Sequence, residues 1–463
     1  MFPFPRVAAW LAAVALAALI PFSAAADEPP ATAFPLKLGE GGRHLVDQHG
    51  VPFLIAGESP QALMVNVSEK EAELFFANRK SHSFNTVWIN LLCRNGTGGR
   101  PNGSTYDGIA PFKSADDLAS PNEEYFARCD RMLRLAEKHG FLVYLDPCET
   151  IDHLKLMLKN GPEKCREFGR YLGRRYKDFD NILWMHGNDF QTWKKAEDDA
   201  VALALAQGIR DKDARHLHTI ELDYLVSGSH DDARWEPLID LSGSYTYYPT
   251  YAQVLKDYNH PSAKPVVMIE SCYEFEQNST PAILRRQEYW SLLSGAAGQL
   301  YGNGYTWPFK PGWKDKLDTP GAIQMAYLQG LFLPRPWHTL VPDQKHKVVT
   351  AGFGTFDGTT SPGNAYVMTS DYVTAARSPD GNLVMAYLPS RRTIKVDMSQ
   401  LSAPATARWY DPSRGTFTAI DKGPLKNAGE HSFTPPGNNG DGDGDWVLLL
   451  ETNPPAEGTE RKK

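Results

Sequence analysis

The chain has 463 residues, of which 42% are hydrophobic, and its formal net charge is -7. This length and composition suit one large globular domain with a smaller one beside it, and they exclude a disordered or fibrous chain. The mild negative charge and the lack of a dense lysine and arginine tract exclude nucleic acid as the expected partner.

The amino terminus has the pattern of a secretory signal peptide. Arg6 precedes an apolar stretch at residues 7–22, and a run of alanines ends at Ala26. We therefore predict that residues 1–26 are removed and that the protein is exported to the periplasm or the extracellular space. A membrane anchor is the alternative, but an anchor needs about twenty apolar residues, and no later segment could span a bilayer.

Residues 33–343 alternate between strand-like and helix-like segments after a hairpin. The first predicted strand ends near Glu58, and the others are at 84–92, 141–147, 181–189, 217–222, 239–247, 264–271 and 297–305. The predicted helices are at 69–80, 122–140, 163–179, 198–213, 251–259, 281–295 and 321–335. This α/β rhythm predicts a (β/α)8 TIM barrel, with the long loop 93–121 as a candidate lid at the strand ends.

The remainder of the chain is predicted to be all-β. Helical periodicity stops near Asp343, and short alternating runs separated by turn residues follow, beginning with NAYVMTS at 364–370. We predict a β-sandwich at residues 344–452 and a disordered tail at 453–463.

The cysteines do not suggest a disulfide framework or a zinc site. Their number is odd and they lack close-pair spacing, so buried free thiols are expected, although one or two bridges could form in an oxidising compartment. They are Cys93, Cys129, Cys148, Cys165 and Cys272.

Two carboxylates follow apolar strands at places where a barrel carries its chemistry. Asp189 ends the fourth predicted strand and Glu270 ends the seventh. Strand ends face one cleft, and two carboxyls about 5 Å apart are the apparatus of a retaining glycosidase. Asp189 would be the acid/base and Glu270 the nucleophile. Each could instead cap a helix or pair with an arginine, but a lone acid after a buried strand is costly unless it is partnered or used.

Several segments resemble the apiosidase-like glycoside hydrolases, family 140, over about residues 36–451. They are WMHGND, MIESCYE, GAAGQLYGNGYTWPF and RPWHTLVPD, and ARWYDPSRG, FTPPG and DWVLLLE resemble the sandwich that follows the barrel in that family. The sandwich often carries a collagen-binding label, which implies no collagen contact here. The family's acid/base Asp after strand four and nucleophile Glu after strand seven match Asp189 and Glu270.

The resemblance also suggests substrate-binding residues. The wider clan usually has Asn before its acid, as Asn188 is here, together with a Tyr after strand six and a Trp after strand eight. Tyr245 or Tyr247 could hydrogen-bond Glu270 and keep it ionised, and Trp307 could lie under a sugar ring. The alternative for all three aromatic residues is packing.

His186 alternates onto the same side of its strand as Asn188 and could line the cleft, although a barrel-core histidine is the alternative. Relatives commonly have Gly-Asp-Thr-Ala-Trp after strand one, where this chain has residues 57–61, GESPQ. Glu58 is therefore a substrate-binding candidate in a changed setting. Residues 146–150, DPCET, also replace the more usual Pro-Thr-Trp type of segment. The sugar is thus left open between apiose on a branched pectin side chain, another pentose and a hexose.

The DGDGD segment at 441–445 resembles the start of a calcium loop, but Trp446 replaces the turn glycine and Thr452 replaces the bidentate Glu. A solvated turn is therefore expected, and no metal is assigned.

The sequence predicts an exported retaining glycoside hydrolase that acts on a plant or microbial cell-wall polysaccharide or oligosaccharide without a cofactor. One alternative is a non-catalytic carbohydrate-binding or adhesion protein on a decayed barrel. The other is a metal-assisted hydrolase using His186, His218 and Asp146, which lack the close histidine pairing of such sites.

Overall fold

A computed structural model describes residue 1 and residues 32–191, 195–223, 225–358 and 364–455. The predicted signal peptide beyond residue 1 and the predicted tail from residue 456 lie outside the described residues. Within the described ranges, no helix combines the length and the apolar composition needed to cross a membrane.

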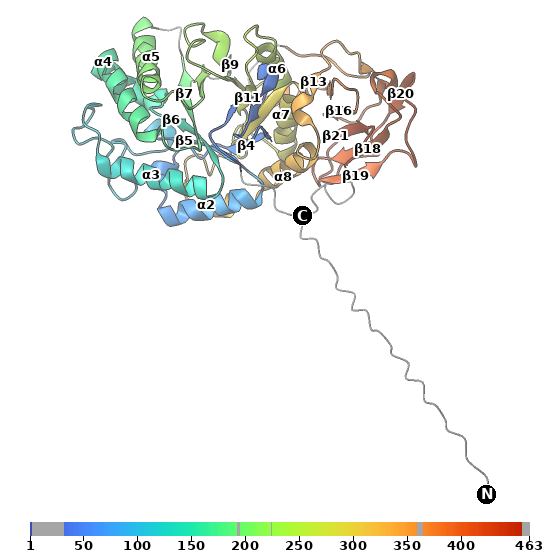
Figure 1. Cartoon of the computed structure of the whole chain (residues 1–463), viewed down its shortest axis with the longest axis horizontal. Helices are drawn as coiled ribbons and strands as arrows, with labels where there is room; N and C mark the ends of the chain where they lie inside the picture. Colours follow the sequence, from blue (N-terminus) through green and yellow to red (C-terminus); the bar gives the residue numbers. More distant parts are fainter. Residues whose placement is uncertain (2–31, 192–194, 224, 359–363, 456–463) are drawn as a thin grey trace. The chain divides into compact units, whose positions relative to one another are not determined.

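Eight strands of one sheet run parallel to their neighbours, and helices lie around them (Figure 1). The strands are β4 (Ile55–Glu58), β5 (Thr86–Asn90), β6 (Leu142–Asp146), β7 (Ile182–Phe190), β8 (His218–Leu222), β10 (Ser242–Thr246), β11 (Val266–Glu270) and β12 (Ala296–Tyr301). Between β8 and β10, Asp240 N–H donates to the His218 carbonyl (2.8 Å). There the Ser229 hydroxyl also accepts from Gly243 N–H (2.8 Å) and donates to the Ile220 carbonyl (2.5 Å). The predicted (β/α)8 barrel is confirmed.

Helices cover the outside of the barrel. They are α1 (Leu63–Asn66), α2 (Glu69–Ser81), α3 (Glu123–Lys138), α4 (Thr150–Tyr176), α5 (Ala196–Arg210), α6 (Thr250–Tyr258), α7 (Pro281–Leu293) and α8 (Pro320–Phe332). Ser68 and Glu71 form a capping box at α2, because the Ser68 hydroxyl accepts from Glu71 N–H (3.2 Å) and the Glu71 carboxylate accepts from Ser68 N–H (3.0 Å). Three short strands, β1 (Lys37–Leu38), β2 (Leu45–Val46) and β3 (Pro52–Phe53), pair ahead of the barrel, and β9 (Val226–Gly228) pairs antiparallel with β10.

Helix α4 is longer than predicted. It spans Thr150–Tyr176, whereas the sequence pattern predicts only residues 163–179. Gly161 has a φ of 75° and precedes Pro162, so two helical segments meet at a kink. These two residues disfavour helix and conceal the first segment in the sequence.

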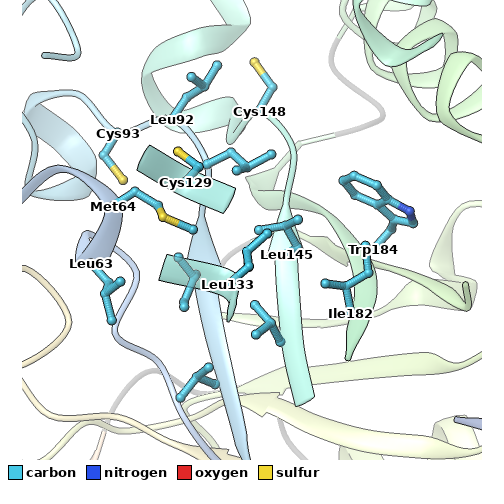
Figure 2. Packing of buried hydrophobic residues seen from close by; sticks show 14 of the residues in the cluster. Leu63, Met64, Leu92, Cys93, Cys129, Leu133, Leu145, Cys148, Ile182 and Trp184 are labelled. Carbon is cyan, nitrogen blue, oxygen red and sulfur yellow. The ribbon is translucent and has the colours of Figure 1, made fainter. Parts of the chain in front are cut away.

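Two apolar layers hold the barrel together. Trp88 and Tyr144 belong to a cluster in the barrel interior. A larger cluster lies between the strands and the covering helices, where Figure 2 shows Leu133 of α3 beside Leu145 of β6, with Trp184 of β7 nearby. Burial of each large side chain contributes about 1.5–3 kcal/mol. This packing fixes the strand ends on which the polar side chains stand.

The five cysteines are buried and none is in a disulfide. They agree with the expectation of buried thiols.

The second part of the chain is a sandwich of two antiparallel sheets, as predicted. One sheet has the order β13-β15-β16-β21-β18-β19 and the other the order β14-β17-β20. The strands are β13 (Val341–Pro342), β14 (Val349–Ala351), β15 (Thr374–Arg377), β16 (Leu383–Leu388), β17 (Ile394–Asp397), β18 (Thr406–Asp411), β19 (Thr416–Ala419), β20 (Glu430–Phe433) and β21 (Trp446–Glu451). Val384, Val396 and Leu448 lie in the core of this sandwich.

One predicted strand of the sandwich is wrong. Residues 364–370 were expected to be extended, but Asn364–Thr369 form helix α9. Arg286 of α7 donates to the carbonyls of Val367 (2.9 Å) and Met368 (2.5 Å). Val367 is fully buried in the cluster shared with α7. The tertiary contact with α7 therefore overrides the alternating pattern.

An arginine from the barrel holds the Asp441–Asp445 turn. Arg285 of α7 donates to both carboxylate oxygens of Asp445 (2.8 Å each) and to Asp443 (2.7 Å). The Asp445 side chain is 2% exposed. The expectation of a solvated turn is therefore wrong at Asp445, where a guanidinium supplies the compensating positive charge.

Candidate active site

Polar side chains gather where the barrel strands end. Asp189 stands near the end of β7, Glu221 near the end of β8, Tyr245 near the end of β10 and Glu270 at the end of β11. In a barrel of this kind these ends face one mouth. Asp189 is close enough to Glu270 for its charge to raise the pKa of that carboxyl.

Glu270 is held by phenolic hydroxyl groups. Tyr247 donates to one of its carboxylate oxygens (2.6 Å) and Tyr273 to the other (2.8 Å). The Tyr245 hydroxyl in turn donates to the Tyr247 oxygen (3.1 Å). Of the two tyrosines expected at the sixth strand, Tyr247 makes the direct bond. Tyr273, three residues after Glu270, was not singled out in the sequence.

The end of β7 has an unusual backbone. Gly187, Asn188 and Asp189 have φ angles of 103°, 66° and 58°, and the pairing with β8 shifts register after His186. A Cβ atom on Gly187 would lie 2.1 Å from the Glu221 carbonyl oxygen. Asn and Asp tolerate the left-handed region better than most residues, so the sequence at this turn is suited to it. Asn188 and Asp189 are therefore consecutive residues in the left-handed conformation.

Burial is the main cause of the raised pKa values of Asp189 and Glu270. It raises the pKa of Asp189, and the nearby Asp223 raises it further. Burial also raises the pKa of Glu270, with the Asp189 charge adding to the effect, while the hydroxyls of Tyr247 and Tyr273 lower it. Two buried carboxyls in this relation hold one proton between them over a range of pH. The hydroxyls of Tyr247 and Tyr273 favour the ionised form of Glu270, and the Tyr245 hydroxyl lowers the pKa of Asp189 in the same way.

Gln61 connects the two sides of the site. Its side-chain oxygen accepts from the Asn188 amide (3.3 Å), and its amide nitrogen donates to the Tyr273 hydroxyl (3.4 Å). Gln61 ends the GESPQ segment and provides a polar link between Asn188 and Tyr273. The sequence marked this segment as altered but gave no role to Gln61.

Glu221 is the acidic residue that the sequence analysis missed. It is 1% exposed and accepts a hydrogen bond from the Asp189 backbone N–H (3.3 Å). Burial raises its pKa, and the charges of Glu270 and Asp189 raise it further. Its place at the end of the fifth predicted strand was the signal that could have found it.

Glu58 does not belong to the cleft. It is completely buried, and its carboxylate pairs with Arg79 of α2 and accepts from the Thr306 hydroxyl. Because Ile55 lies in the barrel interior, alternation along β4 turns Glu58 toward the helices. The expectation that Glu58 binds substrate is corrected by this ion pair.

Two other predicted substrate-binding residues, His186 and Trp307, have different surroundings from each other. His186 is 3% exposed, its Nε2 lies 3.0 Å from Nδ1 of His218, and burial lowers its pKa to about 3. Its ring lies against Trp235, so it is a core histidine rather than a residue of the cleft. Trp307 is half-buried and donates from its indole to Glu276 (2.7 Å). It stays a candidate for contact with a sugar.

The metal-assisted alternative gains no support from these positions. His186 and His218 hydrogen-bond each other, and His218 is close to Trp184 in the strand-to-helix layer. Asp146 lies on the barrel-interior side, since the adjacent Leu145 packs in the outer layer. The side chains of His186, His218 and Asp146 therefore do not converge on one metal site.

Elsewhere, His230, Glu236 and His260 have ligand atoms within 4.8 Å of one another. Lys264 donates to Glu236 at 3.0 Å, and the two imidazoles are stacked with their centroids 3.9 Å apart. The lysine already supplies the positive charge that Glu236 needs, and we assign no metal there.

A cavity of about 720 Å³ lies at the opposite end of the barrel, against the amino terminus of β12. His44, Trp337 and Gly295 are among its lining residues, and none of the strand-end residues described above lines it. It is separate from the carboxylate pair.

The model of the apiosidase-like catalytic domain matches residues 39–339, which is more than half of the chain. The chain belongs to the apiosidase-like family. A second model, described as "Putative collagen-binding domain of a collagenase", matches residues 363–451 of this apiosidase-like protein. A search of the curated proteins found no match.

Solved structures agree with the family assignment. One structure, titled "Glycoside hydrolase", is 25% identical, with a TM-score of 0.77, and the match covers 90% of this chain and 97% of that one. A glycoside hydrolase family 5 protein from Bacteroides vulgatus is 24% identical, with a TM-score of 0.77 and coverage of 91% and 95%. The family and the fold together support glycosidase activity for the apiosidase-like protein.

Proposed function

We propose that this apiosidase-like protein is a retaining glycoside hydrolase in which Glu270 is the nucleophile and Asp189 is the acid/base. In the first step the Glu270 carboxylate attacks the anomeric carbon, and Asp189 gives its proton to the departing glycosidic oxygen. In the second step ionised Asp189 removes a proton from water, which attacks the same carbon and releases Glu270. The anomeric configuration is inverted twice and therefore retained.

The observation that carries this proposal is the hydrogen bonding of the buried Glu270 carboxyl. Both oxygens of Glu270 accept a phenolic hydroxyl, at 2.6 and 2.8 Å. Hydrogen bonds to a charged group contribute about 1.5–3 kcal/mol each, so they favour the ionised nucleophile. Asp189 is half-buried and its pKa is raised, which suits a proton donor.

The stereochemical course tests the mechanism. In proton NMR of the hydrolysis, the first sugar released should have the anomeric configuration of the substrate. Glu270→Gln should lower kcat by at least about 10³-fold, and Asp189→Asn by about 10²–10⁴-fold on substrates with poor leaving groups. For Asp189→Ala, added azide should restore turnover and give a glycosyl azide of retained configuration. An inverted first product would contradict the proposal.

The same measurements address the non-catalytic alternative. If Glu270→Gln still binds glycan as tightly as wild type and the wild type releases sugar, the protein is an enzyme whose binding and chemistry are separable. A wild type that binds wall polysaccharide and cleaves none of it would instead favour the adhesion protein.

We propose a plant or microbial cell-wall polysaccharide as the substrate. The family name points to apiosides, whereas the altered segments at residues 57–61 and 146–150 leave other pentosides and hexosides open. A panel of pectic side chains, other wall polysaccharides and aryl glycosides should show release of a single sugar type.

We propose also that the enzyme is exported after removal of residues 1–26. Intact-mass measurement of material collected outside the cytoplasm should give a chain that begins at Asp27. Recovery of the full chain, with Met1 and the apolar segment at 7–22 still attached to membranes, would support the anchor alternative.

A further inference from the structure

Glu221 of β8 contacts the backbone of Asp189, the proposed acid/base residue. Ile220, the preceding residue, packs in the layer between strands and helices, so alternation along β8 turns Glu221 toward the barrel interior. Its Oε2 accepts from the Asp189 backbone N–H (3.3 Å). Its Oε1 is buried and has no hydrogen-bond partner among the residues that the structure describes. One oxygen of the carboxyl is thus engaged and the other is free.

The groups that face Glu221 are acids and phenols. Asp146 of β6, Asp189 of β7 and Glu270 of β11 all act on its charge, and its charge in turn acts on Tyr245 and Tyr273. In the described part of the chain, no arginine or lysine forms an ion pair with any of these carboxyls. Glu221 is 1% exposed, so an ionised Glu221 would be a further uncompensated negative charge at a buried position, which is strongly disfavoured.

The nearest bases on the same strands do not change this balance. His186 of β7 and His218 of β8 hydrogen-bond each other in the helix-side layer, and burial lowers the pKa of both. Neither imidazole is a cation that Glu221 could pair with.

We propose that Glu221 is a positioning residue for Asp189 and that it acts as an uncharged carboxylic acid, with Oε2 accepting the Asp189 N–H and Oε1 carrying a proton. This inference rests on the proposed function of Asp189. The backbone at Asp189 is left-handed, and the turn before it includes Gly187 beside the Glu221 carbonyl. The Thr150 hydroxyl donates to the carbonyls of Gly187 (2.9 Å) and Asn188 (3.0 Å), and the Glu221 side chain anchors the Asp189 N–H at the end of the same turn. An uncharged anchor does this without adding a negative charge next to the ionised nucleophile.

Glu221→Gln and Glu221→Met test the two parts of the proposal by kinetics. Glutamine keeps a carbonyl oxygen for Asp189 N–H and replaces the O–H by N–H, so kcat and both limbs of the pH profile should stay close to wild type. Methionine fills a similar volume but accepts no hydrogen bond, so kcat should fall about 10- to 100-fold while KM changes little. A Gln variant as impaired as the Met variant would show that the charge is needed. A Met variant as active as wild type would show that Glu221 positions nothing.

Thermal unfolding supplies a readout that needs no substrate. Glu221 has a pKa above its ordinary value of 4.5 when folded, so burial of the neutral acid stabilises the protein fully only below that value, and this contribution is lost as the pH rises toward the folded pKa. Glutamine does not titrate. The melting temperature of Glu221→Gln minus that of wild type should therefore become more positive from pH 5 to pH 8. A difference that is constant over this range would overturn the uncharged assignment.

Glu288 of α7 provides the matched control. It is 6% exposed, and burial raises its pKa well above the ordinary value, but it lies on a helix rather than at a strand end. Glu288→Gln should show the same growth of the melting difference with pH and unchanged kinetics. If the wild type cleaves no glycoside at all, the function proposed above fails, whereas the melting experiment still decides the charge state of Glu221.

Discussion

Glu270 accepts hydrogen bonds from Tyr247 and Tyr273, and each of them favours the ionised carboxylate. Removing the hydroxyl in Tyr273→Phe should therefore raise the pKa of Glu270. Because the nucleophile must be ionised, the acidic limb of the kcat/KM profile should move to higher pH by about 1–2 units, and kcat/KM near its acidic limb should fall about tenfold or more. The measurement is a pH series of initial rates on one substrate.

Tyr144 is the control for that change. It is a fully buried tyrosine inside the barrel, and its hydroxyl has no hydrogen-bond partner in the described structure. Tyr144→Phe should leave the acidic limb where it is. An equal shift in both variants would mean that the Tyr273 hydroxyl acts on overall packing rather than on Glu270.

At the scale of single residues, the two catalytic predictions are those for which two independent signals coincide. Asp189 and Glu270 each follow an apolar strand and also match a family position. Glu58 also follows an apolar strand, but alternation along β4 turns its side chain to Arg79. The sequence of so short a strand does not show which of its residues face the barrel interior and which face the helices. Glu221 was missed because it carries only one signal, its place at the end of the fifth predicted strand, and matches no family position that the sequence analysis used.

At the scale of elements, the end of β7 is the part of the barrel that the proposed chemistry depends on most. Gly187→Ala introduces a Cβ 2.1 Å from the Glu221 carbonyl at a φ of 103°. The left-handed conformation alone costs about 1–2 kcal/mol for a residue with Cβ, and the contact with β8 adds to it. We expect a lower melting temperature together with a loss of kcat, because the turn that carries Asp189 must move.

Gly330 separates this effect from a general cost of replacing glycine. It lies in α8, and a Cβ there would meet nothing within 4 Å. Gly330→Ala should raise stability by about 0.5–1 kcal/mol through helix propensity and leave kcat unchanged. If Gly187→Ala behaved in the same way, the strained turn would have no part in the site.

The elements that the sequence predicted correctly are those that the local pattern of apolar and turn residues is sufficient to define. All eight barrel strands lie within the predicted runs or within one residue of them, since apolar runs bounded by turn residues define a buried parallel strand. Helix α9 depends on Arg286 of α7, and the first half of α4 lies before a Gly-Pro pair that ordinarily ends a helix. These contacts are distant in sequence or contradict local propensity, so the pattern alone could not give them.

At the scale of the whole molecule, the barrel and the sandwich share a core. One apolar cluster contains Trp290 of α7 and Leu328 of α8 together with Met385 and Leu449 of the sandwich. Buried charges cross the same boundary, since Arg335 after α8 donates to Glu451 of β21 (2.8 Å). Cutting the chain between the domains would expose this surface, so the sandwich contributes to the stability of the catalytic barrel whatever else it binds.

The Arg285 cluster is where this coupling can be measured. Arg285 is 1% exposed and Asp445 2%, so Arg285→Met leaves a buried carboxylate without its cation, a change that costs about 3–5 kcal/mol. Arg414 contacts the same turn through Asp441 (3.2 Å), but its side chain is 59% exposed, and Arg414→Met should cost less than about 1 kcal/mol. Thermal unfolding should therefore show a large decrease for Arg285→Met and almost none for Arg414→Met. If removal of calcium with a chelator lowered the wild-type melting temperature by as much as Arg285→Met does, a metal rather than the guanidinium would hold the turn.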